Sequence, residues 1–268
     1  MGYNFKGKTV VITGASSGIG KEMTSRLINK FGCTVYAIAR REGLLNELRQ
    51  ELGDRLIPCP FDASVKENWT SFAARLNDEG VIVDTLINCA GVLPKFSSVE
   101  NMDSAAVSEA MNINFFAQVY ATEAMLPIVK KSTQGGIISF ASSSALCPFA
   151  GVSAYCASKS ASRMYFECLA RENRKIYVST VMNGFVKTDI MKNQGASEKD
   201  TKLFSRVCAD LNKTVRRIMR KIRWKRVRIV VGLDAHLMNF LYKCFPNAGP
   251  RLVSRILKKS GLEIFSQI

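Results

Sequence analysis

The sequence predicts an α/β fold in which helices cover both faces of a doubly wound, mostly parallel sheet. Short apolar runs rich in β-branched residues alternate with stretches of helical character along the chain. The first run, 9–13, is continuously apolar apart from its ends, as is typical of a strand buried on both faces. A glycine-rich turn then leads into the first helical stretch. The expected strands are 9–13, 34–39, 56–62, 83–88, 136–141, 176–182 and 227–231.

The turn after the first strand is a candidate phosphate-binding site. Its order of strand, glycine turn and helix is the context that a dinucleotide fingerprint requires. Gly14 allows a tight turn, Gly18 lets the backbone approach a pyrophosphate, and Gly20 lets the helix pack close to the strand. The free N–H groups and the dipole at the helix start favour a phosphate anion. The expected contacts are Gly14, Ser16, Ser17, Gly18, Ile19 and Gly20. The alternative is a glycine-rich turn without a ligand.

The end of the second strand predicts which nicotinamide cofactor is preferred. An acidic residue at this place binds the ribose 2′-hydroxyl of NAD, but Ala39 occupies it. Arg40 and Arg41 follow, and guanidinium groups form forked, charge-assisted hydrogen bonds to a phosphate. The sequence therefore predicts NADP(H) in preference to NAD(H), with Arg40 as the main contact. The alternative is a solvated pair at a helix start, which is the favoured interpretation of Arg41.

Tyr155 and Lys159 form a candidate acid–base pair. Their spacing of four residues places both on one face of a helix. A neighbouring ammonium favours the phenolate and lowers the pKa of a tyrosine from its usual value of roughly 10. Such a tyrosine exchanges a proton near neutral pH. Ser142, at the end of the strand at 136–141, is suited to hydrogen-bond a reacting carbonyl oxygen. The alternative is an ordinary pair on a helix surface.

Together with Asn88-Cys89-Ala90-Gly91, these motifs resemble the short-chain dehydrogenase/reductase family over roughly residues 5–195. The resemblance implies a Rossmann-like fold and hydride transfer between a nicotinamide cofactor and an alcohol or ketone. It implies that Tyr155 is the catalytic acid/base, that Lys159 lowers the tyrosine pKa and holds the nicotinamide ribose, and that Ser142 polarises the carbonyl. Ser143 and Ser144 are of the same type, but the spacing to Tyr155 favours Ser142.

The resemblance also implies roles for further residues. Asn114, thirteen residues before Pro127, matches an asparagine that holds a water-linked proton path to the lysine. The remaining implied cofactor contacts are Asp62 and Ala63 beside the adenine, Asn88, Ala90 and Gly91 around the central pocket, and Gly184, Val186 and Thr188 over the nicotinamide amide. Asn183 departs from the family pattern, which usually has proline there. Family members are often homodimers or homotetramers, and we expect the same here.

We expect one oxidoreductase domain over 1–268, with a substrate lid and helical region at 189–225 and a basic amphipathic extension at 232–268. Apolar residues before Tyr155 and in the implied lid predict a pocket for a bulky or lipid-like carbonyl or alcohol, such as a hydroxysteroid. They are Leu146, Phe149, Val152, Met191, Leu203 and Phe204.

The charge is concentrated in the C-terminal quarter. The net charge of the whole chain is +16. Residues 199–268 hold 17 Lys and Arg against 4 Asp and Glu, whereas residues 1–198 hold 21 Lys and Arg against 18 Asp and Glu. Leu203, Val207, Leu211, Val215, Ile218 and Ile222 form an apolar stripe at helical spacing. Two interpretations stay open: the basic helices pack on the domain with a solvated face, or they contact an anionic membrane peripherally. Nucleic acid is not expected as a partner, because no binding module accompanies the charge.

The remaining composition predicts a cytoplasmic protein, with membrane association as the open alternative. The chain shows neither a secretory leader nor an apolar run long enough to span a bilayer. Its eight cysteines lack a Cys-x-x-Cys pair, and its single histidine, His236, has no clustered partners, so we expect reduced thiols and no metal site. The leading prediction is an NADP(H)-dependent oxidoreductase. The alternative is a cofactor-binding regulatory or peripheral membrane protein whose catalysis is secondary or lost.

Overall fold

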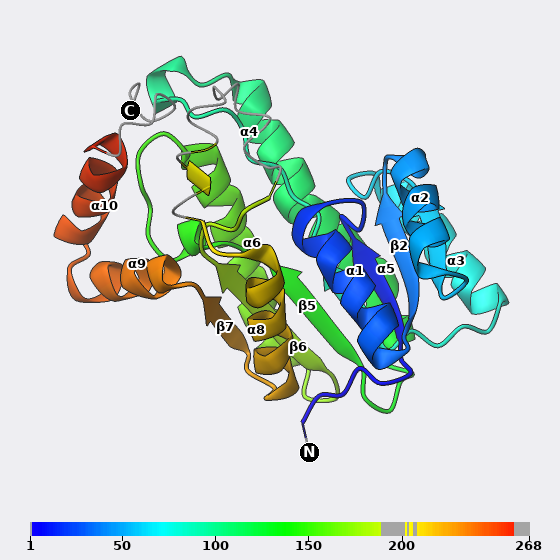
Figure 1. Ribbon diagram of the computed structural model, residues 1–268. Helices are drawn as coiled ribbons and strands as arrows, with labels where there is room; N and C mark the ends of the chain where they lie inside the picture. The colour runs from blue at the N-terminus through cyan, green and yellow to red at the C-terminus, as the bar shows by residue number, and fades with distance from the viewer. Residues whose placement is uncertain (1, 189–201, 203, 206–207, 260–268) are drawn as a thin grey trace.

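A computed structural model describes residues 2–188, 202, 204–205 and 208–259, and its seven described strands form one parallel sheet (Figure 1). The strand order is β3-β2-β1-β4-β5-β6-β7. The strands are β1 (Thr9–Thr13), β2 (Thr34–Ala39), β3 (Leu56–Pro60), β4 (Thr85–Asn88), β5 (Gly136–Phe140), β6 (Tyr177–Asn183) and β7 (Arg228–Val231). The predicted Rossmann-like α/β fold is confirmed, and each predicted strand ends within about two residues of the observed one.

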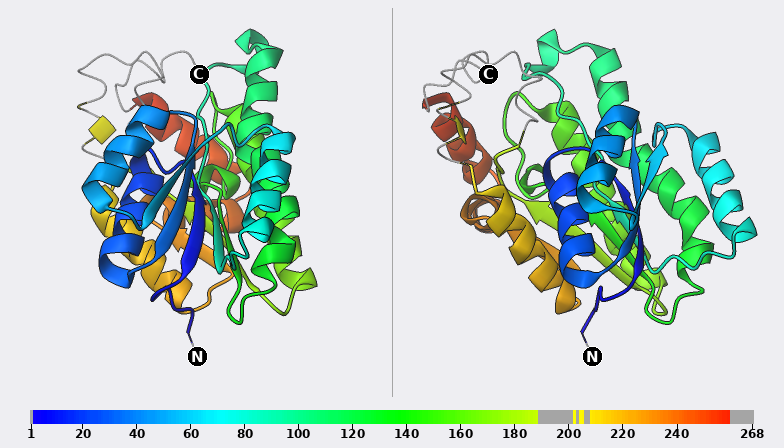
Figure 2. Two further views of the ribbon diagram at one scale, coloured as in Figure 1. Left: turned by 90° about the vertical axis from the view of Figure 1, so that its right-hand side faces the viewer. Right: turned by 45° about the vertical axis from the view of Figure 1, so that its right-hand side comes forward.

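Helices cover both faces of the sheet (Figure 2). One face packs against α1 (Gly18–Phe31), α2 (Glu42–Leu52) and α8 (Leu211–Arg223). The other packs against α3 (Lys66–Asp78), α5 (Ala117–Val129) and α6 (Ser153–Glu172). The central strands are buried on both faces, which explains why their sequences are continuously apolar.

The predicted apolar stripe places α8 on the sheet. Val215, Ile218 and Ile222 are fully buried, while the basic side chains of this helix lie outward. Leu203 and Val207 lie outside the described residues, as does most of the predicted lid before residue 208.

Three further helices surround the edge where the strands end. Helix α4 (Ser104–Met111) continues through a π-helical turn, Asn112–Phe116, into α5. Helices α9 (Leu233–Cys244) and α10 (Ala248–Lys259) follow β7, the last strand of the sheet (Figure 1). Two short 3-10 turns lie at Val99–Asn101 and Ser143–Ala145.

Candidate active site

A cavity of about 590 Å³ opens at the carboxyl ends of the strands. It extends from the glycine turn and Arg40 to Tyr155 and Lys159. Strands β1 and β4 are neighbours at its centre, where the strand order reverses, and this is where ligands bind in open α/β sheets. All of the predicted cofactor contacts except Asn88 line it, together with Ser142.

The glycine turn has the close approaches that only glycine allows. Gly14 has a φ of +70°, and a Cβ added there would lie 2.9 Å from the Cα of Ala90. A Cβ on Gly20 would lie 2.2 Å from the carbonyl oxygen of Gly14. Helix α1 therefore starts against the end of β1, and its first unpaired N–H groups are suited to a pyrophosphate. These contacts fit a nicotinamide dinucleotide.

Thr13, which the sequence did not single out, joins the ends of β1 and β4. Its Oγ1 accepts hydrogen bonds from the N–H groups of Cys89 and Ala90, each at 3.0 Å. Asn88 does not line the cavity, because its amide lies on the other side and donates to Thr122 Oγ1 of α5 at 3.4 Å. Asn88 is thus placed to position the strand end and does not touch the cofactor cavity.

Both arginines line the cavity beside the glycine turn. Arg40 lies 3.9 Å from the carboxylate of Asp62 and is largely exposed. Arg41 is exposed, as we favoured, and it also donates from Nη2 to Ser16 Oγ at 3.1 Å. The second guanidinium is therefore tied to the glycine turn, a contact that depends on how α1 and α2 pack.

Helix α6 presents Tyr155 and Lys159 to the cavity next to Ser142. Lys159 Nζ lies 5.9 Å from the centre of the Tyr155 ring and donates to the carbonyl oxygen of Phe140 at 3.0 Å. Ser142 Oγ accepts a hydrogen bond from the N–H of Ser144 at 3.2 Å. Three of the four predicted catalytic side chains, Ser142, Tyr155 and Lys159, therefore lie at one end of the cavity.

Burial controls the protonation of this pair. It raises the pKa of Tyr155 to about 12, and a hydrogen bond with Ser142 only partly offsets this. Burial also lowers the pKa of Lys159 to about 8. The structure does not bear out the expected lowering of the tyrosine pKa by Lys159, because desolvation raises that pKa.

Asn114 lies behind the cavity, inside the π-helical turn, and is fully buried. Its Nδ2 donates to the carbonyl of Val92 at 2.9 Å and to Ser158 Oγ at 3.0 Å, and its Oδ1 accepts from the N–H of Val92. A Cβ on Gly91 would lie 2.9 Å from Asn114 Oδ1 and 3.0 Å from Lys159 Nζ. Glycine at 91 therefore lets Asn114 and Lys159 approach the same point.

The far end of the cavity has apolar and aromatic walls. Phe149, Val152 and Phe204 line it as predicted, and Leu93, Phe96 and Phe185 line it in addition. Leu146 does not line it, because it packs in a separate buried cluster with Ala141, Ala145 and Met182. Met191 and Leu203 lie outside the described residues.

Asp234 of α9 holds the turn that begins at Gly184. Its Oδ2 accepts a hydrogen bond from the N–H of Phe185 at 2.6 Å. A Cβ on Gly184 would lie 2.0 Å from the Asp234 carboxylate, so this contact requires glycine. Asn183 donates from Nδ2 to the carbonyl of Gly184 at 2.9 Å. These two side chains position a turn for which the family usually uses proline.

The fold and cavity define a Rossmann-like, nicotinamide-dependent class of protein. Residues 8–199 match the short chain dehydrogenase family. The chain belongs to the short-chain dehydrogenase/reductase family. This membership confirms the predicted family and its Rossmann-like fold.

Individual relatives support the same class. The chain is 34% identical over 201 residues to dehydrogenase/reductase SDR family member 7B of Danio rerio, covering 71% of this chain and 64% of that protein. It is 33% identical over 193 residues to 11-beta-hydroxysteroid dehydrogenase A of Sesamum indicum, covering 70% of this chain and 55% of that protein. The match thus spans less than two thirds of either relative.

A solved structure shows the same fold. The short chain dehydrogenase of Burkholderia cenocepacia in complex with NADP superimposes with a TM-score of 0.79 at 22% identity, covering 95% of this chain and 99% of that chain. Among the described residues, no helix is both long and apolar enough to cross a bilayer. The same residues contain no group of three or more His, Cys, Asp or Glu side chains arranged to hold a metal ion.

Proposed function

We propose that this protein is an NADP(H)-dependent oxidoreductase that interconverts an apolar ketone and its secondary alcohol. One observation carries the proposal: a single cavity joins the two guanidinium groups to Ser142, Tyr155 and Lys159, and continues into an aromatic wall. The relatives whose names include 11-beta-hydroxysteroid dehydrogenase support a bulky apolar substrate.

The cofactor preference rests on Ala39 and the two arginines after it. Each guanidinium at a 2′-phosphate forms charge-assisted hydrogen bonds, each worth about 1.5–3 kcal/mol. We expect Arg40→Ala and Arg41→Ala each to raise the Michaelis constant for NADPH about tenfold or more and to leave that for NADH nearly unchanged. Arg49→Ala on α2, where the side chain pairs with Asp54, is the matched control. A wild-type Michaelis constant lower for NADH than for NADPH contradicts the preference.

In the reduction, the side chains around the substrate oxygen supply acid catalysis. When bound, the reduced nicotinamide supplies the hydride. Tyr155, protonated at neutral pH, donates its proton to the carbonyl oxygen, and the Ser142 hydroxyl holds that oxygen. Lys159 holds the nicotinamide ribose, and Asn114 stands beside it in the proposed proton path. In the oxidation of an alcohol these proton transfers reverse.

The substrate class is tested by following NADPH and NADH oxidation at about 340 nm over steroid, fatty and small polar carbonyls. We expect turnover of an apolar class with NADPH, because aromatic rings line the substrate end. Equal turnover of polar and apolar carbonyls contradicts the apolar pocket. Tight NADPH binding with no turnover favours the alternative in which the chain retains its cofactor but has lost its chemistry.

A second candidate function is peripheral contact with an anionic membrane through α9 and α10. These helices and the turn between them concentrate exposed apolar side chains: Leu233, Leu237, Phe240, Tyr242, Phe245, Leu252 and Ile256. Basic side chains lie among them at Lys243, Arg251, Arg255, Lys258 and Lys259. Their carboxylate, Asp234, is engaged with the Gly184 turn. An apolar surface ringed by cations is complementary to anionic lipid.

The opposite faces of α9 and α10 pack behind the substrate end of the cavity. Met238, Val253 and Leu257 join the cluster of Phe149 and Val152. We expect the double variant Leu237→Gln and Phe240→Gln to lower co-sedimentation with phosphatidylglycerol vesicles about tenfold or more. The control, Ile82→Gln with Val99→Gln, removes exposed apolar side chains elsewhere. Equal sedimentation of all three proteins contradicts the contact.

We also expect a homodimer or homotetramer formed through the α4–α5 segment and α6. Phe116 and Met164 on these elements are exposed large apolar side chains. Light scattering of the purified chain tests the state, and a monomer at micromolar concentration contradicts it.

A further inference from the structure

A second cavity, of about 610 Å³, lies at the opposite end of the sheet from the candidate active site. It forms where residues 2–5, the second half of α1 and helix α8 meet. Figure 1 shows the N-terminal segment beside the lower ends of these two helices. The two cavities share no lining residue. The reaction proposed above therefore leaves this cavity without a role.

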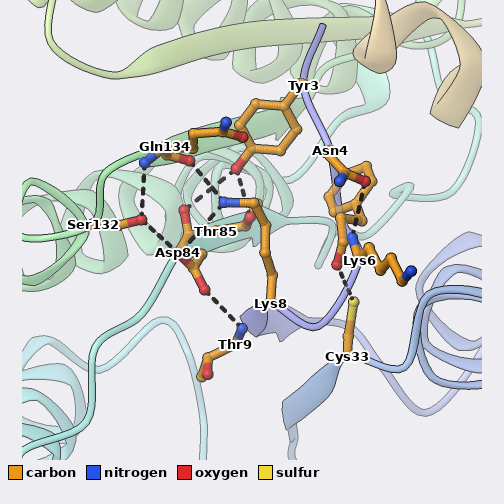
Figure 3. Close-up of polar contacts among 11 residues, drawn as sticks. Tyr3, Asn4, Lys6, Lys8, Thr9, Cys33, Asp84, Thr85, Ser132 and Gln134 are labelled. Carbon is orange, nitrogen blue, oxygen red and sulfur yellow. Dashed lines mark hydrogen bonds and ion pairs between the residues drawn. The ribbon is translucent and has the colours of Figure 1, made fainter. Parts of the chain in front are cut away.

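The walls of the second cavity are held in place by the N-terminal segment (Figure 3). The Tyr3 hydroxyl is hydrogen-bonded to Thr85 Oγ1 at 2.6 Å and donates to the carbonyl of Asp84 at 3.3 Å. The backbone N–H of Tyr3 donates to the carbonyl of Arg223 at 2.9 Å. Lys8 Nζ bonds both the Asp84 carboxylate and the carbonyl of Gln134. These contacts fix the segment to β4 and to the end of α8 before any ligand arrives.

The floor of the cavity is apolar and its rim is cationic. Tyr3, Phe5, Phe31 and Met219 supply the apolar lining. Five cationic side chains also line it: Arg26, Lys30, Arg216, Arg220 and Arg223.

Four of the five cations have no carboxylate partner in the part of the chain that the structure describes. Arg26 pairs with Glu22 at 2.5 Å and also bonds Asn212. Within the described residues, the other four cations form no ion pair, and Arg220 instead lies against the ring of Trp224 at 5.5 Å. Gathering these like charges around one cavity is unfavourable, and a bound anion relieves that repulsion.

We propose that this cavity binds an amphiphilic anion, with a phosphate or carboxylate group held by the cationic rim and an apolar body on the aromatic floor. Arg216, Arg220 and Arg223 present guanidinium forks, whose geometry matches these two anions. A solvated basic helix needs no hollow beneath it, whereas here aromatic rings and a methionine line one. This site is independent of the proposed reaction.

The binding is tested by calorimetry on the full chain saturated with NADPH, which occupies the first cavity. The probes are inorganic phosphate and monomeric butyl, octyl and dodecyl phosphate. We expect affinity to rise along the series, with dodecyl phosphate binding at least about a hundredfold tighter than phosphate. We expect the fluorescence of Trp224 to change on binding, because its ring contacts Arg220. Trp69 is fully buried on the other face of the sheet, so its fluorescence should stay unchanged. Equal affinity for phosphate and dodecyl phosphate overturns the proposal.

Two triple variants distinguish binding in this cavity from nonspecific attraction of the anion to the basic surface. Arg216→Gln, Arg220→Gln and Arg223→Gln together are expected to weaken dodecyl phosphate binding about tenfold or more. The control, Lys213→Gln, Arg217→Gln and Arg226→Gln, removes the same charge from neighbouring positions that do not line the cavity. Equal losses in both variants overturn the proposal.

Co-sedimentation with phosphatidic acid vesicles shows whether the ligand is a free amphiphile or the headgroup of a membrane lipid. If the first triple variant loses dodecyl phosphate binding but sediments normally with phosphatidic acid vesicles, the ligand is a free molecule. If it loses both, the cavity accepts the headgroup of a membrane lipid. Either result supports an anion site with an apolar body.

Discussion

Desolvation determines which protonation state the two facing side chains of α6 adopt. Tyr155, with its pKa raised to about 12, is a phenol at neutral pH and is therefore suited to donate a proton. Lys159, with its pKa lowered to about 8, is close to its titration range under the same conditions. Tyr155 is thus the proton donor of this pair at neutral pH.

Removing the Tyr155 hydroxyl tests its role directly. We expect Tyr155→Phe to lower kcat for reduction by about a hundredfold to ten-thousandfold, because the phenol that supplies the proton to the carbonyl oxygen is removed. The dissociation constant for NADPH should stay within about threefold, since the glycine turn and the arginines are untouched. Tyr165→Phe, on the same helix but away from the cavity, is the control. Near-normal turnover of Tyr155→Phe would falsify the assignment.

The lowered pKa of Lys159 predicts how NADPH binding depends on pH. Below about pH 8 the ammonium is charged and attracts the anionic cofactor, and above it this attraction is lost. The dissociation constant of NADPH, measured by fluorescence from pH 6 to 10, is therefore expected to rise above about pH 8. Lys159→Met should remove this rise. A wild-type constant that does not change up to pH 10 contradicts the prediction.

At the scale of single elements, close backbone approach determines where α1 begins. Gly20 allows the helix to start against the carbonyl of Gly14, and Gly14 in turn lies against Ala90 at the end of β4. The same principle operates on the nicotinamide side, where Asp234 of α9 reaches the backbone of the Gly184 turn. Two turns far apart in sequence thus depend on the absence of a Cβ.

Gly20 and Gly43 form a matched pair for testing this point. A Cβ on Gly20 would lie 2.2 Å from a carbonyl oxygen, whereas one on Gly43, in α2, would meet nothing within 4 Å. We expect Gly20→Ala to lower the free energy of unfolding by about 1–3 kcal/mol and to weaken NADPH binding. Gly43→Ala should leave that free energy within about 1 kcal/mol of the wild type. Urea denaturation measures both, and equal values contradict the steric argument.

At the scale of the whole molecule, the sheet separates two cavities of similar volume. The first lies at the carboxyl ends of the strands and the second at their amino ends, and α1 extends from one to the other. Helix α8 lines only the second. The molecule therefore has two places where a ligand can stabilise the folded state.

Ligand-dependent stability tests whether these cavities are independent. A ligand at about 100 times its dissociation constant stabilises the folded state by about 2.7 kcal/mol. We expect NADPH and dodecyl phosphate to stabilise the protein separately and their contributions to add when both are present. Chemical denaturation with each ligand alone and with both measures this. A combined stabilisation no greater than that of one ligand indicates that they compete for one site.

The sequence by itself determined the order of strands and helices, the glycine turn and the types of residue at the site. These are local properties: apolar runs predict the strands, and a spacing of four residues places Tyr155 and Lys159 on one helix face. The bounds of the strands were less certain, because sheet pairing decides where a strand ends.

Only the tertiary structure decided which side chains face the cavity and which pKa values they have. Asn88 turns toward α5, Arg41 reaches Ser16, and Asp234 reaches the Gly184 turn. These contacts join segments distant in sequence, so no local pattern contains them. The same holds for burial, which raised the pKa of Tyr155 where the spacing to Lys159 predicted a decrease. Desolvation depends on the complete packing around a group, and packing exists only once the chain has folded.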